Sequence, residues 1–146
     1  NVSVPTPLTF SNNVLVLEFI GDNGAFAPKL KDEIPKNPGE FFGKIIANMR
    51  KLHKAGLVHA DLSAFNILNY NEKPVFIDFS QCTTLKSSRA KEYLERDIRN
   101  ICNFFKKVYH KIKRRSLLIT KSFSKQDPFK VNNMTVIHLL KTSNNF

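Results

Sequence analysis

Four polar residues between positions 57 and 81 have the types and spacing needed for chemistry on phosphate groups. The segment reads LVHADLSAFNILNYNEKPVFIDFSQ: His59 precedes Asp61 by two residues, Asn66 follows it by five, and Asp78 lies twelve beyond the Asn. Transfer of a phosphoryl group from a nucleotide requires one carboxylate near the attacking hydroxyl, together with an amide and a carboxylate that hold magnesium. The segment therefore predicts a magnesium-dependent phosphoryl-transfer site.

The four residues have different expected roles, and Asp61 and Asp78 each also have an ordinary structural alternative. Asp61 would orient the attacking hydroxyl and accept its proton, or else it would cap its own loop. Asn66 offers a neutral oxygen to a hard cation. Asp78 follows an apolar strand, where its carboxylate would reach the metal or form a buried turn. We expect His59 to brace the loop by hydrogen bonding.

The elements that must position these residues follow from hydrophobic periodicity. Apolar residues recur at three- and four-residue steps from Phe42 to Leu52, and Pro38 suits a first helical position, which predicts an amphipathic helix. Leu57-Val58 would be a very short strand. Apolar runs at 67–70 and 74–77 predict a β-hairpin.

Four further segments complete the expected elements. A helical period from about Ser88 to Ile112 predicts a long helix, and 136–140 is a candidate for a final helical turn. Residues 14–20 predict a buried strand that ends at a Gly-rich turn. Residues 25–37 contain several prolines and predict a surface loop or a short helix.

Composition indicates one globular domain. The chain has 146 residues, 42% of them hydrophobic, and no stretch approaches the roughly 18 apolar residues that span a membrane. Its two cysteines, Cys82 and Cys102, lack metal-ligand spacing, so we expect reduced thiols in a cytoplasmic protein. The chain starts at Asn1 rather than Met, which suggests a fragment of a longer protein.

Positive charge is concentrated in the last third of the chain. The net charge is +11, and residues 98–146 hold 11 of the 23 Lys and Arg but one of the 12 Asp and Glu. Over residues 106–115 cations interleave with Tyr109 and apolar side chains, which on a helix gives one packing face and one positive face. This run is either a solvated helix end or a surface for RNA phosphates.

The motif and its flanks resemble the RIO family of atypical serine/threonine protein kinases. HADLSAFN (59–66) and IDFSQ (77–81) are similar to the catalytic and metal-binding loops of that family. Ala60 and Ser63 stand where ordinary kinases carry Arg and Lys. The segment 14–24 resembles the hinge strand of the first RIO subfamily, and 90–105 resembles the helix after the metal loop. The resemblance covers roughly residues 2–109.

This resemblance implies the C-terminal lobe of a kinase together with its hinge. The implied fold is α+β and mostly helical, with a small β-hairpin at the catalytic and metal loops and most of the N-terminal lobe absent. Residues 1–24 would be the end of that lobe and the hinge, 25–115 the C-lobe, and 116–146 a basic, partly helical segment. ATP and Mg²⁺ are the implied cofactors.

Residue roles also follow from the resemblance. Asp61 would be the catalytic aspartate. Ser63 would replace a lysine near the γ-phosphate, which favours a weak phosphotransferase or an ATP-driven switch. Asn66 and Asp78 would bind Mg²⁺, and Asp78 is also the candidate to receive phosphate transiently during ATP turnover.

The hinge and the missing N-terminal parts set a further expectation. The backbone of Glu18 and of Ile20 would meet the adenine edge. The family's N-lobe supplies a phosphate-covering loop, a lysine for the α- and β-phosphates and a glutamate that pairs with it. No glycine-rich loop pattern occurs in this sequence. We therefore expect this chain alone to bind ATP poorly and to hydrolyse little of it.

The RIO-type context implies a protein substrate or autophosphorylation, and a role in maturation of the small ribosomal subunit, whose RNA would contact residues 106–115. Two other interpretations stay open. One is a small-molecule phosphotransferase of the aminoglycoside or choline kinase type, which shares His-x-Asp and the Asn after it. The other is a non-catalytic preribosome- or RNA-binding module. Asp97 would form a surface ion pair or brace the catalytic-loop backbone.

Overall fold

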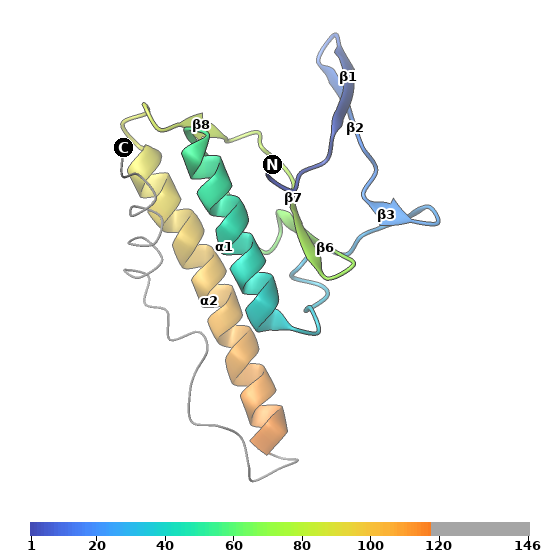
Figure 1. Ribbon diagram of the computed structural model, residues 1–146, viewed down its shortest axis with the longest axis vertical. Helices are drawn as coiled ribbons and strands as arrows, with labels where there is room; N and C mark the ends of the chain where they lie inside the picture. The colour runs from blue at the N-terminus through green and yellow to red at the C-terminus, as the bar shows by residue number, and fades with distance from the viewer. Residues whose placement is uncertain (118–146) are drawn as a thin grey trace.

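The computed structural model describes residues 1–117, with the side chains of residues 1–112. Two long antiparallel helices lie side by side, with a β-hairpin next to them, while a second hairpin projects away from this body (Figure 1). The candidate helical turn at 136–140 lies outside the described residues. Neither helix in the described part is long and apolar enough to cross a membrane.

The helix pair α1 (Pro38–Lys54) and α2 (Ala90–Leu117) forms the main core. α1 begins where the Asn37 side chain accepts the Glu40 N–H at 3.2 Å, a helix cap that agrees with the expected start. Between the helices Phe42 and Phe105 meet edge to face, with 5.3 Å between ring centroids. The helix residues that belong to the main hydrophobic cluster are Phe41, Phe42, Ile45, Ile46, Met49, Leu52, Ile98, Ile101 and Phe105.

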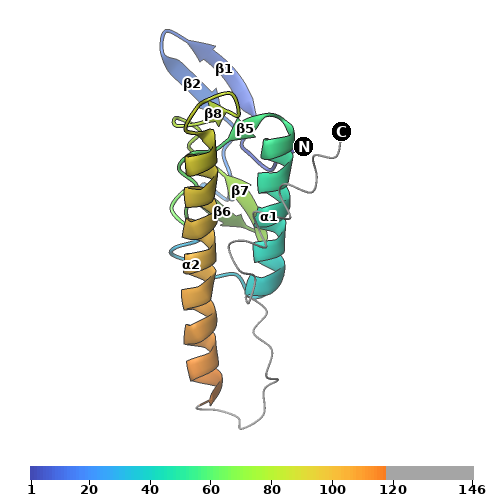
Figure 2. The ribbon, with the colours of Figure 1, turned by 90° about the vertical axis from the view of Figure 1, so that its left-hand side faces the viewer.

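Two small antiparallel pairs frame the motif. β5 (Leu57–Val58) pairs with β8 (Thr83–Thr84), and β6 (Ile67–Tyr70) pairs with β7 (Lys73–Phe76). The turn between β6 and β7 has positive φ at both Asn71 and Glu72, the geometry that suits a two-residue hairpin. The hairpin lies against the helix pair in the second view as well (Figure 2). The expected short strand and hairpin are confirmed.

The segment from residue 7 to residue 26 forms two further hairpins. β1 (Pro7–Ser11) pairs with β2 (Val14–Leu17), and β3 (Gly21–Asp22) pairs with β4 (Ala25–Phe26). The expectation of a buried strand at 14–20 is wrong, because every residue of β2 is exposed. Apolar composition makes a strand suitable for burial, but no other described element covers this hairpin.

Residues 27–31 run along the free edge of β6. The Asn69 N–H donates to the Pro28 carbonyl and the Leu30 N–H to the Ile67 carbonyl, both at 2.8 Å. Leu30 is fully buried in the main core. The expected surface loop at 25–37 is therefore only partly correct. Residues 27–31 form a third, strand-like segment along the edge of the β6–β7 hairpin.

Candidate active site

The catalytic-loop segment, residues 59–66, lies between β5 and β6 and brings Asp61 and Asn66 together. The Asn66 side-chain amide donates to the Asp61 carbonyl oxygen at 2.9 Å and to Asp61 Oδ2 at 3.1 Å. The Asn66 N–H donates to the Ser63 carbonyl at 3.0 Å, which closes the loop. Asp61 is exposed. A carboxylate that is fixed but solvent-accessible can approach a substrate hydroxyl.

Asp97 on α2 holds the backbone on both sides of Asp61. Its two carboxylate oxygens accept the N–H groups of Ala60 and Leu62, each at 2.9 Å. Asp97 is only 1% exposed, so the interpretation as a surface ion pair is wrong and the interpretation as a brace is confirmed. Arg96 donates to the Ala60 carbonyl and Asn100 to the Leu62 carbonyl, which extends the contact between α2 and the loop.

The burial of Asp97 changes its protonation. Burial raises the pKa of the Asp97 carboxyl to about 6, against the two backbone N–H groups, which act to lower it. Around neutral pH the carboxylate is therefore mainly charged and is stabilised by these donors. Ala60, one of the two residues it holds, has a φ of 66°. A non-glycine residue in this region needs external support.

His59 joins the catalytic loop to the segment that ends in Asp78. Its Nε2 lies 3.1 Å from the Ile77 carbonyl oxygen. A carbonyl oxygen only accepts, so Nε2 carries the proton. Burial lowers the pKa of His59, although Asp61 and Asp78 act in the opposite direction. The predicted bracing role agrees with this geometry, and the imidazole is neutral at neutral pH.

Asp78 lies just beyond β7 with an exposed carboxylate. Its φ is 61°, and Ser80 donates to Oδ1 from its hydroxyl at 2.6 Å and from its N–H at 3.3 Å. These hydrogen bonds from Ser80 lower the pKa of Asp78, with smaller contributions from His59 and Lys29. Asp78 is therefore ionised at neutral pH, and the interpretation as a buried turn residue is wrong.

The oxygens of Asn66 and Asp78 fit a magnesium site. Within residues 1–112, no hydrogen-bond donor is assigned to Asn66 Oδ1 or to Asp78 Oδ2. The two segments are joined because the Ile77 N–H donates to the Asn66 carbonyl at 3.0 Å. The same part of the chain holds no group of three or more His, Cys, Asp or Glu suited to a metal. A cation here would take its remaining ligands from phosphate and water, as Mg²⁺ commonly does.

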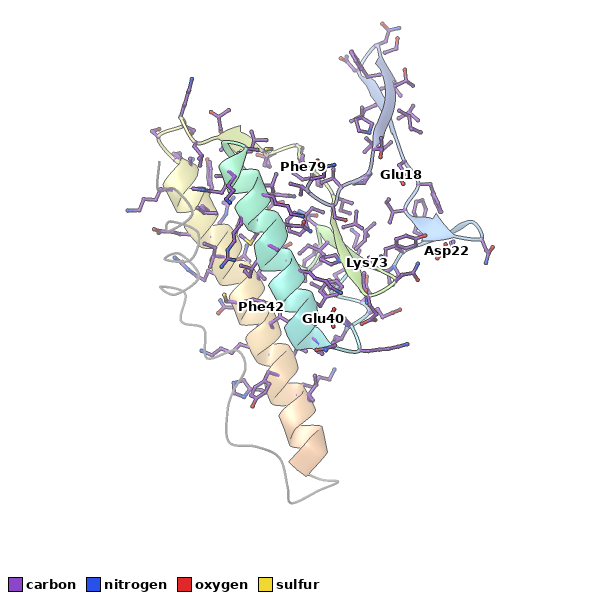
Figure 3. The ribbon with its side chains drawn as sticks, viewed as in Figure 1. Glu18, Asp22, Glu40, Phe42, Lys73 and Phe79 are labelled. Carbon is purple, nitrogen blue, oxygen red and sulfur yellow. The ribbon has the colours of Figure 1, made fainter. Side chains whose placement is uncertain are left out.

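Two other predicted site residues have defined surroundings. The Glu18 N–H donates to the Thr6 carbonyl at 2.8 Å, and the Ile20 carbonyl accepts the Ala27 N–H at 2.9 Å. Among the described residues, the Glu18 carbonyl and the Ile20 N–H have no assigned partner, so they could pair with the edge of a base. Glu18 directly follows β2, where the chain leaves the β1–β2 hairpin (Figure 3).

Ser63 is half-buried, and its hydroxyl accepts the Phe65 N–H at 3.3 Å. This hydrogen bond is local to the loop. It neither supports nor excludes the role of Ser63 near a γ-phosphate, which stays a prediction.

An apolar surface between the hinge and the metal loop was missed at the level of sequence. Ala27, Leu68 and Val75 form a buried cluster, with Ile20 and Ile77 packed against it. The signal was present as a period of two in the hairpin, where 68, 75 and 77 share one face and 67 and 76 the other. Ile20 and Ile77 are only partly buried, so the cluster offers an apolar surface on which the ring face of a nucleotide base could stack.

Comparisons with known proteins agree with this geometry. The family model described as the RIO domain matches residues 1–117. The RIO-type serine/threonine-protein kinase Rio1 of Methanocaldococcus jannaschii is 44% identical over 107 residues, which is 73% of this chain and 37% of that protein. The serine/threonine-protein kinase RIO1 of Saccharomyces cerevisiae is 38% identical over 112 residues, 73% of this chain and 23% of that protein. This chain therefore spans well under half of either relative.

Solved structures give the same fold. The Rio2 kinase of Chaetomium thermophilum, in a complex described as ADP/Mg²⁺-phosphoaspartate, covers 99% of this chain, and the match takes in 44% of that protein. The TM-score is 0.61 at 24% sequence identity. The expected α+β fold, with part of a kinase-like architecture, is confirmed.

Proposed function

Because this chain belongs to the RIO family of serine/threonine protein kinases, we propose that it forms the hinge and C-lobe of a RIO-type kinase or ATPase that transfers the γ-phosphate of ATP. The observation that carries the proposal is the pairing of Asp61 with Asn66 on a loop held by Asp97. Preorganised groups of this kind supply the positioning on which phosphoryl transfer depends.

In the proposed reaction, each residue acts through an identified atom. An Asp61 carboxylate oxygen accepts the proton of the attacking hydroxyl, while the Asn66 amide limits its rotation. Asn66 Oδ1 and the Asp78 carboxylate would hold Mg²⁺, which when bound offsets the negative charge of the phosphates. The Glu18 carbonyl and the Ile20 N–H would align the adenine. Asp78 would also be the acceptor in a transient phosphoaspartate, the group that the Rio2 kinase complex of C. thermophilum contains.

The first experiment measures phosphate release from ATP. Residues 1–146 would be assayed alone and joined to the segment that precedes the matched region in the M. jannaschii relative. We expect hydrolysis from the joined protein and little from residues 1–146 alone, since a phosphate-covering loop would then be supplied. Asp61→Asn or Asp78→Asn in the joined protein should each lower kcat by about a hundredfold or more.

The matched control is Asp32→Asn, which makes the same change at an exposed carboxylate that pairs with Lys31. It should leave kcat unchanged. Full activity in either Asp61→Asn or Asp78→Asn would contradict the proposal. Robust hydrolysis by residues 1–146 alone would contradict only the expectation that further phosphate-binding parts are needed.

The proposed context is maturation of the small ribosomal subunit, with a protein substrate or autophosphorylation. Support comes from family membership and from exposed lysines on α2, Lys106, Lys107 and Lys111.

The non-catalytic alternative predicts RNA binding that survives Asp61→Ala without any ATP turnover. The small-molecule alternative predicts phosphorylation of aminoglycosides or choline in a substrate screen.

A further inference from the structure

Lys29 lies beside the hairpin that carries the candidate metal ligands. It forms an antiparallel bridge with Leu68, and this bridge is flanked by the hydrogen bonds from Asn69 to Pro28 and from Leu30 to Ile67. Residues directly opposite one another in an antiparallel pair place their side chains on the same face. Lys29 therefore shares a face with Leu68.

The same register extends across the hairpin to the metal loop. Leu68 pairs with Val75, and two residues back along the strand the Asn66 carbonyl accepts the Ile77 N–H. Because side chains alternate along a strand, Asn66 and Leu68 belong to one face. Lys29 thus stands on the face that carries Asn66 and the apolar surface proposed for adenine.

The opposite face of this three-strand layer is closed to Lys29. Leu30, Ile67 and Phe76 alternate with the residues above, and all three are fully buried in the main core. The Lys29 side chain is exposed, and no carboxylate partner is assigned to it among the described residues, whereas its neighbour Lys31 pairs with Asp32.

We propose that the Lys29 ammonium group contacts the phosphates of the bound nucleotide. This inference rests on the proposed function, because it assumes a nucleotide over Leu68 and a metal at Asn66 and Asp78. Lys29 would bring a positive charge to a site where Ser63 offers none from the catalytic loop. A lysine is suited to this contact because its ammonium is a compact charge on a flexible stem.

The first test compares affinities for Mg-ATP and for adenosine, measured by NMR titration of the joined protein described above. Lys29→Ala should weaken Mg-ATP binding about tenfold, which is the loss of one charge-assisted contact. Adenosine affinity should not change, because adenosine has no phosphate. Lys29→Arg should retain most of the Mg-ATP affinity. The control Lys91→Ala, at an exposed lysine on the first turn of α2, should change neither affinity.

The second test uses an ATP acyl phosphate as a proximity probe. The Lys29 amine attacks the acyl carbon, an amide bond forms, the acyl carbon–oxygen bond breaks, and ATP and a proton leave. Mass spectrometry should find Lys29 acylated, with strong protection by excess Mg-ATP. Acylation of Lys91 should be slow and insensitive to Mg-ATP.

The outcomes separate this inference from the proposed function. Unchanged Mg-ATP affinity in Lys29→Ala, with acylation of Lys29 that Mg-ATP does not reduce, would overturn the assignment of Lys29 and leave the proposed function intact. An equal loss of adenosine affinity would also overturn it, since the effect would then be structural. If the wild-type joined protein binds neither Mg-ATP nor adenosine, the proposed function and this inference both fail.

Discussion

At the scale of single residues, His59 connects the two loops of the candidate site as a neutral group. Its Nε2–H donates a hydrogen bond to the Ile77 carbonyl, and its Nδ1 is buried without an assigned partner in the described part of the chain. Protonation would place a second N–H and a positive charge in that buried position. The folded state should therefore resist protonation of His59 more than the unfolded chain does.

The consequence is a stability that depends on pH. The folded pKa of His59 is lowered from 6.5, so its contribution to the free energy of unfolding is complete above about pH 6.5 and decreases as the pH falls below it. His59→Gln keeps an amide donor for the Ile77 carbonyl but does not titrate. Between pH 6.5 and 5, the unfolding free energy of the wild type should fall more steeply than that of the variant, by at most about 1.4 kcal/mol per pH unit.

Urea denaturation at several pH values measures this difference. Asp97 acts in the opposite sense, because its raised pKa gives stability that is lost as the pH rises through about 6. That contribution is common to both proteins and cancels in the comparison. His53→Gln, on α1, is the control and should follow the wild type. Parallel curves for wild type and His59→Gln would contradict the prediction.

Spacing along the sequence predicted which residues meet within one loop. The brace from Asp97 was only one of two interpretations, and Lys29 was not singled out. Asp61 and Asn66 are five residues apart on the same short loop, and their side chains form a hydrogen bond. The contact from Asp97 crosses 37 residues to Ala60. Neither this contact nor the bridge at Lys29 has a local signal, because both depend on how distant elements pack.

At the scale of elements, α2 is the support of the catalytic loop as well as half of the core. Both carboxylate oxygens of Asp97 accept hydrogen bonds, one from each of the N–H groups that flank Asp61. Asp97→Ala would leave two buried N–H groups without partners. Since each unsatisfied donor costs about 1–3 kcal/mol, we expect the unfolding free energy to fall by about 2–5 kcal/mol.

Chemical denaturation at pH 7 measures the unfolding free energy of Asp97→Ala. The control is Asn103→Ala, at an exposed position of the same helix. The control should change stability by less than about 0.5 kcal/mol. In the joined protein, Asp97→Asn should also lower kcat more than it raises KM, because it disturbs the loop that orients Asp61 and leaves the hinge unchanged. Equal stabilities for Asp97→Ala and Asn103→Ala would show that the two hydrogen bonds contribute nothing.

The helices were predictable, and so was the presence of the outer strand, but its exposure was not, for one physical reason. An amphipathic helix such as α1 carries its own signal, since its apolar stripe must face a core. A strand with the sequence Val-Leu-Val-Leu is suited to burial, but its burial requires a sheet or helix to cover it. In the described chain β1 is the only strand paired with β2, and both remain exposed.

At the scale of the whole molecule, the C-terminal turns of α2 extend beyond α1 (Figure 1). In the C-terminal half of α2, Lys106, Lys107 and Lys111 are exposed, while Val108 is buried. None of the ion pairs found in the described chain involves these lysines. This positive face is therefore available for a polyanion, while the proposed catalytic groups lie near the other end of the helix pair.

If these lysines bind RNA phosphates, affinity should depend steeply on salt, since each phosphate contact releases counterions. Replacing all three by Ala should lower the slope of log affinity against log salt by about two to three, measured with single-stranded RNA of any sequence. The matched control replaces Lys73, Lys86 and Lys91 by Ala, which removes the same charge from exposed positions elsewhere. An equal change of slope in both triple variants would mean that net charge, and not this face of α2, determines binding. Asp61→Ala should leave the slope unchanged, because the phosphoryl-transfer loop and the basic face are separate surfaces.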